Sequence, residues 1–255
     1  MPDTTNRQNP RPLHGKAALV TGGSRGIGAA TALRLAADGA DVTLTYDKSE
    51  ERAADIVARI KESGSRALAV RMDGTDPDAA RAAVEAAVEE FGRLDILVNN
   101  AGVEGMGTIG TLRLVDVDRV LSVNVRAPYL AAQAAEPHLG EGGRIVNIGS
   151  CVAEYVPFPG MSLYATSKAA MAGLTKGLAR ELGSRGITVN LVTPGPIDTD
   201  MNPADGEGAG AQASLTALGR YGDAADVAAT VAHLVGDGAR NVSGASIAVD
   251  GGFTA

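Results

Sequence analysis

Short apolar runs alternate along this chain with longer segments in which apolar residues recur at helical spacing. The runs number seven and are four or five residues long: Ala17–Thr21, Val42–Thr45, Ala67–Val70, Ile96–Asn99, Arg144–Ile148, Thr188–Val192 and Ser246–Val249. This alternation is typical of a parallel sheet whose strands are joined by crossover helices. We therefore expect one α/β domain, with a seven-stranded parallel sheet and helices on both faces.

Three of the intervening helices have boundary signals. Ser49 is placed as the start of one helix and Gly64 as its stop. For the next, Asp76 can cap and Pro77 fits the first helical position. Near the C-terminus, a further helix is expected to open at Asp223.

Two segments lack such patterns. Residues 1–14 are polar and contain three prolines, and we expect them to form a mobile N-terminal tail. Residues 202–213, NPADGEGAGAQA, are rich in Gly and Ala. This segment follows the sixth strand at the carboxyl edge of the sheet, where ligands bind in open α/β folds, so it is a candidate lid with little intrinsic order. A plain surface loop is the alternative.

Composition excludes several classes of partner. Apolar residues make up 45% of the chain and aromatic residues 3%, which suits a core of Ala, Val, Leu and Ile. The net charge of -7 argues against nucleic acid or an anionic membrane as a partner. Cys151 is the only cysteine, so we expect no intrachain disulfide, no metal site and a reducing, cytoplasmic setting. No apolar run approaches the roughly 18 residues of a membrane span.

Glycines cluster directly after the first expected strand. Residues 21–28 read TGGSRGIG and precede an Ala-rich helical stretch. Glycines at such a junction let the backbone approach a diphosphate, and the helix N-terminus offers free N–H groups. The Gly-x-x-x-Gly-x-Gly spacing differs from the common dinucleotide fingerprint, and a tight turn without a ligand is the alternative.

Tyr164 and Lys168 lie four residues apart in the segment YATSK, so on a helix they share one face. A nearby ammonium favours the phenolate and lowers the pKa of tyrosine from its ordinary value of about 10. Tyrosine then becomes a usable acid and base near neutral pH. Taken alone, the pair is equally consistent with a solvated helix face.

Together with the segment NNAG at 99–102 and Ser150 after the fifth strand, these features resemble the short-chain dehydrogenase/reductase family. The resemblance covers residues 15–255, with the motifs in the family's order. It is strongest to 3-oxoacyl-carrier-protein reductases and related carbonyl reductases. It implies a Rossmann-type, doubly wound sheet and makes residues 15–255 a dinucleotide-binding and catalytic domain.

The resemblance implies a catalytic tetrad of Asn124, Ser150, Tyr164 and Lys168. Tyr164 would protonate the substrate oxygen while hydride arrives from the nicotinamide, and Ser150 would steady the developing alkoxide. Lys168 would lower the tyrosine pKa and bond the nicotinamide ribose. Asn124 would interrupt its helix and anchor a water in the proton path.

The resemblance also implies a shell of residues around the cofactor. Its members are Gly22, Ser24, Arg25, Ile27, Gly28, Tyr46, Lys48, Ser49, Asp73, Asn100, Ala101, Gly102, Tyr164, Lys168, Pro194, Gly195, Ile197 and Thr199. Asp73 departs from the family pattern, because Gly74 follows it where relatives carry an apolar residue.

NADP(H) is the expected cofactor, with NAD(H) possible. NAD-specific relatives carry an acidic residue at the end of the second strand, and here that position is Tyr46. Arg25 offers a guanidinium suited to a 2′-phosphate, and Lys48 and Ser49 add donors. Asp47 restores some NAD character if the alignment shifts by one residue.

The resulting prediction is an oxidoreductase that acts on a ketone or acyl thioester, as a homotetramer assembled through residues 246–255. Pro157 and Pro159 stiffen the wall of the substrate pocket, which leaves the substrate open. An NAD-dependent alcohol or polyol dehydrogenase on the same tetrad is the first alternative. A catalytically silent, dinucleotide-sensing regulator is the second.

Overall fold

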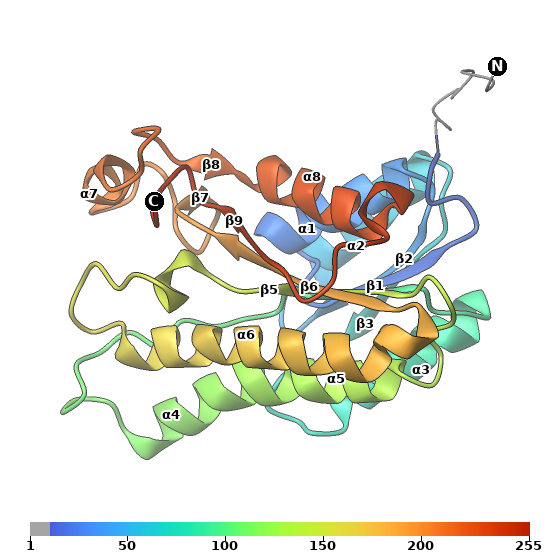
Figure 1. The fold of residues 1–255 in the computed structure, drawn as a ribbon, viewed down its shortest axis with the longest axis horizontal. Coiled ribbons are helices and arrows are strands. Elements are labelled where there is room, and N and C mark those ends of the chain that lie inside the picture. The colour runs from blue at the N-terminus through green and yellow to red at the C-terminus, as the bar shows by residue number, and fades with distance from the viewer. Residues whose placement is uncertain (1–10) are drawn as a thin grey trace.

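Seven parallel strands form the central layer of the computed structural model, which describes residues 11–255. Their order across the sheet is β3-β2-β1-β4-β5-β6-β9, which confirms the expected doubly wound arrangement (Figure 1). The strands are β1 (Ala17–Val20), β2 (Asp41–Tyr46), β3 (Ala67–Arg71), β4 (Ile96–Asn99), β5 (Arg144–Ile148), β6 (Thr188–Pro194) and β9 (Ser246–Val249). All six neighbouring pairs are parallel.

Helices cover both faces of this sheet (Figure 1). One face carries α1 (Gly26–Ala37), α2 (Glu50–Glu62) and α8 (Ala224–Val235). The other carries α3 (Ala79–Phe91), α4 (Leu114–Leu121), α5 (Ala127–Ala135) and α6 (Ser162–Leu182). Among residues 11–255, no helix is long and apolar enough to cross a membrane.

The strands are apolar on both sides because each side meets a helical layer. Along β1, Val20 packs with α1 and α8, whereas Leu19 packs with α3 and α5. Val98 and Leu97 divide in the same way in β4. Burial of both faces explains why the strands read in the sequence as continuous apolar runs.

The expected helix boundaries are met at three ends and missed at one. The stop at Gly64 is met, because α2 ends at Glu62 and Gly64 has a left-handed φ of +85°. As predicted, α2 begins directly after Ser49, and α8 directly after Asp223. However, α3 begins at Ala79 and not at Pro77. The Asp76 carboxylate accepts a hydrogen bond of 2.9 Å from the Asp78 main-chain N, which forms a separate turn before the helix.

Residues 1–10 of the expected N-terminal tail lie outside the described residues. Residues 11–14 form a turn that packs on the domain, so for them the expectation of a mobile tail is wrong. The Leu13 N donates to Asp38 O at 2.8 Å, and Leu13 is only 4% exposed. The apolar Leu13 side chain supplies the reason, since it is removed from water in the layer that contains α1.

An excursion from the sheet, residues 199–221, is called here the flap. Its base is a pair of two-residue strands, β7 (Ile197–Asp198) and β8 (Gly222–Asp223). The flap contains the short helix α7 (Ala209–Ser214), although residues 202–213 were expected to have little order. The side chains of Asn202 and Gln212 exchange two hydrogen bonds, of 3.0 and 3.1 Å, which hold this helix against the start of the flap.

At the amino end of the sheet, Asp95 ties several chain segments together. Its carboxylate accepts hydrogen bonds from Ala17 N at 2.9 Å and from the Arg93 guanidinium at 2.6 and 2.7 Å. Its main-chain O accepts from Arg144 N at 2.9 Å. Burial disfavours the charged form, but the hydrogen bonds from Arg93 and Ala17 outweigh it and hold the pKa of Asp95 below its ordinary value.

We predict that Asp95→Asn lowers the free energy of unfolding at pH 7 by about 1–3 kcal/mol, because buried donors lose a charged acceptor. A carboxyl group whose pKa is lower in the folded state stabilises above its unfolded pKa, and this stabilisation is lost as the pH falls through the folded value. The deficit should therefore stay constant from pH 7 to about 5 and shrink below about pH 4 in urea titrations. A variant as stable as the wild type at pH 7 would contradict the assignment.

Candidate functional site

A cavity of about 870 Å³ lies at the carboxyl ends of the strands, where the strand order reverses between β1 and β4. This is the position at which open α/β sheets bind ligands. Its volume lies in the upper part of the range found for pockets that bind small molecules and cofactors. The loops that follow β1, β2, β4, β5 and β6 all line it.

The glycine loop after β1 is packed so tightly that Gly28 leaves no room for a side chain. A Cβ on Gly28 would lie 2.2 Å from Gly22 O and 2.4 Å from Asn100 Nδ2. Gly22 and Gly26 have φ values of +65° and +53°, which residues with a side chain rarely adopt. The loop therefore brings main-chain N–H groups at the start of α1 to the cavity wall, an arrangement that fits a diphosphate.

Asn100 and Thr21 lock this loop to the end of β4. The Thr21 hydroxyl accepts hydrogen bonds from Asn100 N and Ala101 N, both at 3.0 Å. In return, Asn100 Nδ2 donates to Thr21 O at 2.9 Å and to Gly22 O at 3.1 Å. The Asn100 side chain is therefore a strut that shapes the loop, in addition to lining the cavity.

The β2 end of the cavity, formed by Tyr46, Lys48, Ser49 and Arg52, is polar. Lys48 and Arg52 are exposed there, and Tyr46 and Ser49 are half-buried. Lys48 and Ser49 stand here as the sequence indicated. Arg52, in the first turn of α2, was not predicted, although its place after Lys48 and Ser49 was a usable signal. It forms a short ion pair with Asp200, a residue that no local pattern could bring to this end.

Asp73, which follows β3, lines the same region but also shapes its own turn. Its Oδ1 accepts hydrogen bonds from Thr75 N at 2.8 Å and from the Thr75 hydroxyl at 2.7 Å. The hydrogen bond from the Thr75 main chain is the chief cause that lowers the pKa of Asp73. Gly74 follows it, and a Cβ there would lie 3.2 Å from two side-chain carbons of Val123, which is a tight contact.

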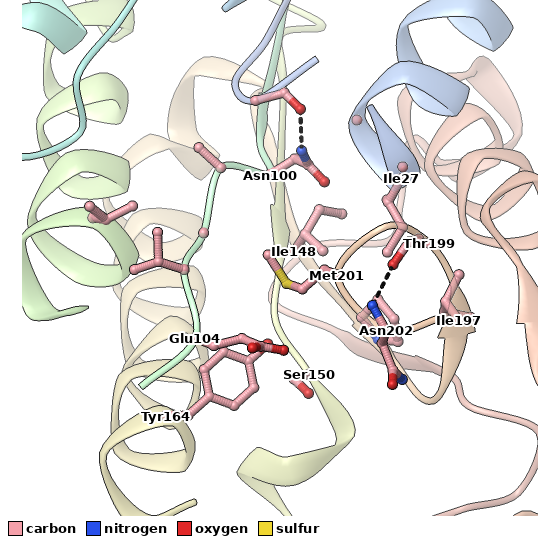
Figure 2. Close-up of a pocket in the computed structure, with 18 of the residues that line it drawn as sticks. Ile27, Asn100, Glu104, Ile148, Ser150, Tyr164, Ile197, Thr199, Met201 and Asn202 are labelled. Atoms are coloured by element: carbon pink, nitrogen blue, oxygen red, sulfur yellow. Dashed lines mark hydrogen bonds between the residues drawn. The ribbon is translucent and has the colours of Figure 1, made fainter. Parts of the chain in front are cut away.

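Ser150, Tyr164 and Lys168 meet at the opposite end of the cavity. Ser150 follows β5, and α6 carries the other two on one face. Figure 2 shows Ser150, Tyr164 and Glu104 gathered at this end. Lys168 is buried, donates to Ile148 O at 3.1 Å, and holds its Nζ 5.8 Å from the centroid of the Tyr164 ring.

Burial dominates the electrostatics of this group. It raises the pKa of Tyr164 to about 12, an effect that Ser150 opposes and the Glu104 carboxylate reinforces. It also lowers the pKa of Lys168 to about 8. A lowered pKa was expected for the tyrosine from its pairing with Lys168, but desolvation of the Tyr164 phenol is the larger effect and has the opposite sign.

Asn124 lies in a π-helical turn, Ser122–Arg126, between α4 and α5, so it does interrupt a helix. It does not line the cavity. Its Oδ1 accepts from Val103 N at 2.8 Å, and its Nδ2 donates to Val103 O at 2.9 Å and Ser167 Oγ at 3.0 Å. Through these hydrogen bonds, Asn124 joins the loop after β4 to α6.

All of the predicted cofactor residues line this one cavity. They are Gly22, Ser24, Arg25, Ile27, Gly28, Tyr46, Lys48, Ser49, Asp73, Asn100, Ala101, Gly102, Tyr164, Lys168, Pro194, Gly195, Ile197 and Thr199. At the last of these positions the packing is close, since a Cβ on Gly26 would lie 3.3 Å from Thr199 Cγ2.

The wall near Tyr164 contains residues that the sequence argument did not assign. Phe158, Met161, Met201 and Phe253 are apolar, and Glu104 is the acidic side chain among them. Cys151 packs with Phe253, and burial raises the pKa of its thiol to about 12, so it is an inert part of this wall. Only Val103 separates Glu104 from the NNAG segment. This closeness to a motif was the signal from which Glu104 could have been predicted to line the cavity.

Known proteins resemble this chain over nearly its whole length. A family model described as enoyl-(acyl carrier protein) reductase matches residues 22–254. The chain is 46% identical to the cyclic-di-GMP-binding biofilm dispersal mediator protein of Escherichia coli (strain K12), over 94% of this chain and 98% of that protein. It is 40% identical to a 3-oxoacyl-(acyl-carrier-protein) reductase of Staphylococcus aureus (strain Mu50), over 93% and 98%.

A solved structure agrees in detail. A short-chain dehydrogenase from Burkholderia cenocepacia J2315, in complex with NADP, is 60% identical with a TM-score of 0.95, and the match covers 96% of this chain and 100% of that one. Fold, cavity and similarity together define a nucleotide-dependent oxidoreductase of the doubly wound α/β class. The chain belongs to the short-chain dehydrogenase/reductase family.

We predict that the wild type gains stability relative to Lys168→Met as the pH rises from about 8 to 10.5. In this interval the unfolded chain binds a proton on Lys168 that the folded protein, with its lowered pKa, does not. The gain should reach about 1–2 kcal/mol in denaturant titrations compared at pH 7.5 and 9.5. A difference between the two proteins that does not change with pH would show that Lys168 titrates normally.

Proposed function

We propose that the protein transfers hydride between NADP(H) and a ketone or the corresponding secondary alcohol. The observation that carries the proposal is the convergence of Ser150, Tyr164 and Lys168 at one end of a cavity whose other parts fit a dinucleotide. NADP in the Burkholderia structure supports this cofactor. A 3-oxoacyl reductase among the relatives supports a carbonyl substrate.

In the proposed reduction, bound NADPH supplies the hydride that reaches the carbonyl carbon. Tyr164 holds its proton at neutral pH, because burial raises its pKa to about 12, and donates it to the substrate oxygen as negative charge develops there. The Ser150 hydroxyl donates a hydrogen bond to the same oxygen. Lys168, with a pKa near 8, can exchange a proton at neutral pH and favours the tyrosinate that remains.

Asn124 acts in this scheme as a positioning residue. Its side chain holds the Val103 main chain and the Ser167 hydroxyl, so it fixes the loop that ends at Glu104 against the helix that carries Tyr164 and Lys168. The expected water-anchoring role of Asn124 stays a prediction.

The walls of the cavity favour a largely apolar ketone without negative charge. Phe158, Met161 and Phe253 supply apolar surface, while Glu104 places a carboxylate close enough to Tyr164 to raise its pKa further. A substrate with its own carboxylate near the carbonyl would meet this charge in a partly desolvated site. Neutral ketones, and ketones with a donor or a cation facing Glu104, are the class that fits.

A panel of ketones tests the proposal. Neutral, cationic and anionic ketones, together with a β-keto thioester and an enoyl thioester, are assayed with NADPH and NADH separately. Turnover of neutral or cationic ketones above anionic ones supports the assignment. Reduction of the enoyl double bond alone would contradict ketone reduction, and preferential oxidation of alcohols with NAD would favour the dehydrogenase alternative.

Replacing Tyr164 by Phe should collapse turnover and spare cofactor binding. Only the proton-donating hydroxyl is deleted, and general acid catalysis is worth about 10²- to 10⁴-fold. Steady-state kinetics with the best ketone of the panel measures the loss, and nicotinamide fluorescence measures NADPH binding. A variant that keeps more than about a tenth of wild-type turnover would refute the role of Tyr164.

NADPH should be preferred over NADH, and Arg25→Ala should reduce the preference. Tyr46 at the end of β2 brings no negative charge to the adenosine ribose, and Arg25 offers a guanidinium to a 2′-phosphate. A charge-assisted contact of roughly 1.5–3 kcal/mol corresponds to about a 10- to 150-fold preference. The measurement is kcat/KM for both cofactors in both proteins. If Arg25→Ala lowers kcat/KM by the same factor with NADPH and with NADH, Arg25 does not bind the 2′-phosphate.

We also propose a homotetramer in a cytoplasmic, reducing setting. The edge strand β9 leaves alternate residues exposed, with Ser246 and Ala248 on the open side, and such an edge suits an interface between subunits. Light scattering should give four chains per particle, and deletion of residues 250–255 should weaken the assembly. A monomer at micromolar concentration would count against it.

Binding of a cyclic dinucleotide in the same cavity is a second candidate function. The name of the Escherichia coli relative suggests it, and Arg25 and Arg52 at the β2 end can pair with a phosphodiester. Displacement of NADPH by cyclic di-GMP, followed by nicotinamide fluorescence, decides whether this ligand competes. Turnover by a protein that also binds it would exclude a catalytically silent regulator.

A further inference from the structure

Asp200 lies at the β2 end of the cavity, although the proposed hydride transfer gives it no task. It follows Thr199 directly in the first turn of the flap, and its side chain is 49% exposed. One carboxylate oxygen, Oδ2, faces two guanidinium groups. Arg52 binds this oxygen in a short ion pair, and the Nη1 of Arg25 lies 4.0 Å from it.

Packing places Asp200 here independently of its charge. A Cβ on Gly26 of the glycine loop would lie 3.3 Å from Thr199 Cγ2, so Thr199 packs closely against this loop. Thr199 and Asn202 are joined by main-chain hydrogen bonds in both directions, and Asn202 is held by Gln212. The main chain of the turn at the start of the flap is therefore held near the two arginines, whereas the Asp200 side chain, which is half exposed, can leave them.

A carboxylate in this position competes with a phosphate. Arg25 and Arg52 are the guanidiniums that line the β2 end, and guanidinium groups bind carboxylates and phosphates through the same N–H donors. Arg52 is the main cause that keeps the pKa of Asp200 below its ordinary value, so the group is ionised at neutral pH. An ionised carboxylate both occupies the donors and repels a second anion.

We propose that Asp200 is a specificity-determining residue for the cofactor. Its carboxylate holds Arg52 and Arg25 as a stand-in for the 2′-phosphate and is displaced from them when NADP(H) binds. With NAD(H), which has no 2′-phosphate, the arginines stay paired with Asp200. The carboxylate therefore narrows the margin by which NADP(H) is preferred. This inference rests on the proposed use of NADP(H) by the same cavity.

The opposite role for Asp200 predicts a change of opposite sign in NADPH affinity when the residue is replaced. If Asp200 mainly arranges the arginines for the phosphate, its removal weakens NADPH binding. If it competes with the phosphate, its removal tightens NADPH binding and leaves NADH unchanged. The sign of one substitution thus separates the two roles.

Equilibrium binding tests the proposal without relying on turnover. Dissociation constants are measured by calorimetry for NADPH and NADH, and for the fragments adenosine 2′,5′-bisphosphate and 5′-AMP. The variant is Asp200→Asn, and Asp205→Asn is the matched control, because Asp205 is an exposed acid of the same flap that does not line the cavity. The same ligands are titrated into Arg52→Gln and into the Asp200→Asn, Arg52→Gln double variant.

Asp200→Asn should bind NADPH and the bisphosphate about two- to fivefold more tightly, the scale of one exposed ion pair. NADH and 5′-AMP should bind as before, and Asp205→Asn should match the wild type. The gain should be smaller in the Arg52→Gln background, because the pair has already been broken.

Three results would overturn the proposal: weaker NADPH binding by Asp200→Asn, an equal change for NADPH and NADH, or an equal gain in Asp205→Asn. If the wild type binds both cofactors equally and Asp200→Asn binds NADPH more tightly, the role of Asp200 is supported. The predicted NADPH preference of the wild type is then contradicted. Equal affinities for both cofactors in both proteins would overturn both.

Discussion

The site depends on the close approach of the chain segments that leave β1 and β4. A Cβ on Gly28 would clash with Gly22 O and the Asn100 amide, and the Thr21 hydroxyl accepts from two main-chain N–H groups beyond β4. The strand order reverses at this point, so the two loops diverge and leave the cavity between them. Side chains on these glycines would close the space, and loss of the Asn100 strut would leave the loop without its support.

Burial divides the cavity into two electrostatic regions. At the β2 end, Arg25, Arg52 and Asp200 are about half exposed, so their ion pairs are weak and exchangeable. At the other end, Lys168 is buried and Tyr164 is half-buried, and their pKa values move apart, to about 12 for Tyr164 and about 8 for Lys168. Exchangeable charges suit the recognition of a soluble anion, whereas shifted pKa values suit proton transfer.

The sequence predicted the sheet, its parallel strands and the cofactor residues that line the cavity, because each depends on local pattern or on short motifs. All seven strands were found within two residues of their ends. It failed where a distant chain segment or the degree of burial decides the outcome. The pairing of Arg52 with Asp200 joins positions 148 residues apart, and the raised pKa of Tyr164 comes from desolvation. The helix α7 is held by the hydrogen bonds between Asn202 and Gln212, and a pairing of this kind cannot be predicted from hydrophobic periodicity.

The start of the flap connects the two ends of the cavity through consecutive residues. Thr199 packs on the glycine loop, Asp200 pairs with Arg52, and Met201 lines the wall of the cavity beside Ile148 (Figure 2). Asn202 then holds α7 through Gln212. Because consecutive residues of one hydrogen-bonded turn line both parts of the cavity, we expect that a ligand that displaces Asp200 also affects Met201 and the flap. Linkage then requires that the substrate alters cofactor affinity by the same factor as the cofactor alters substrate affinity.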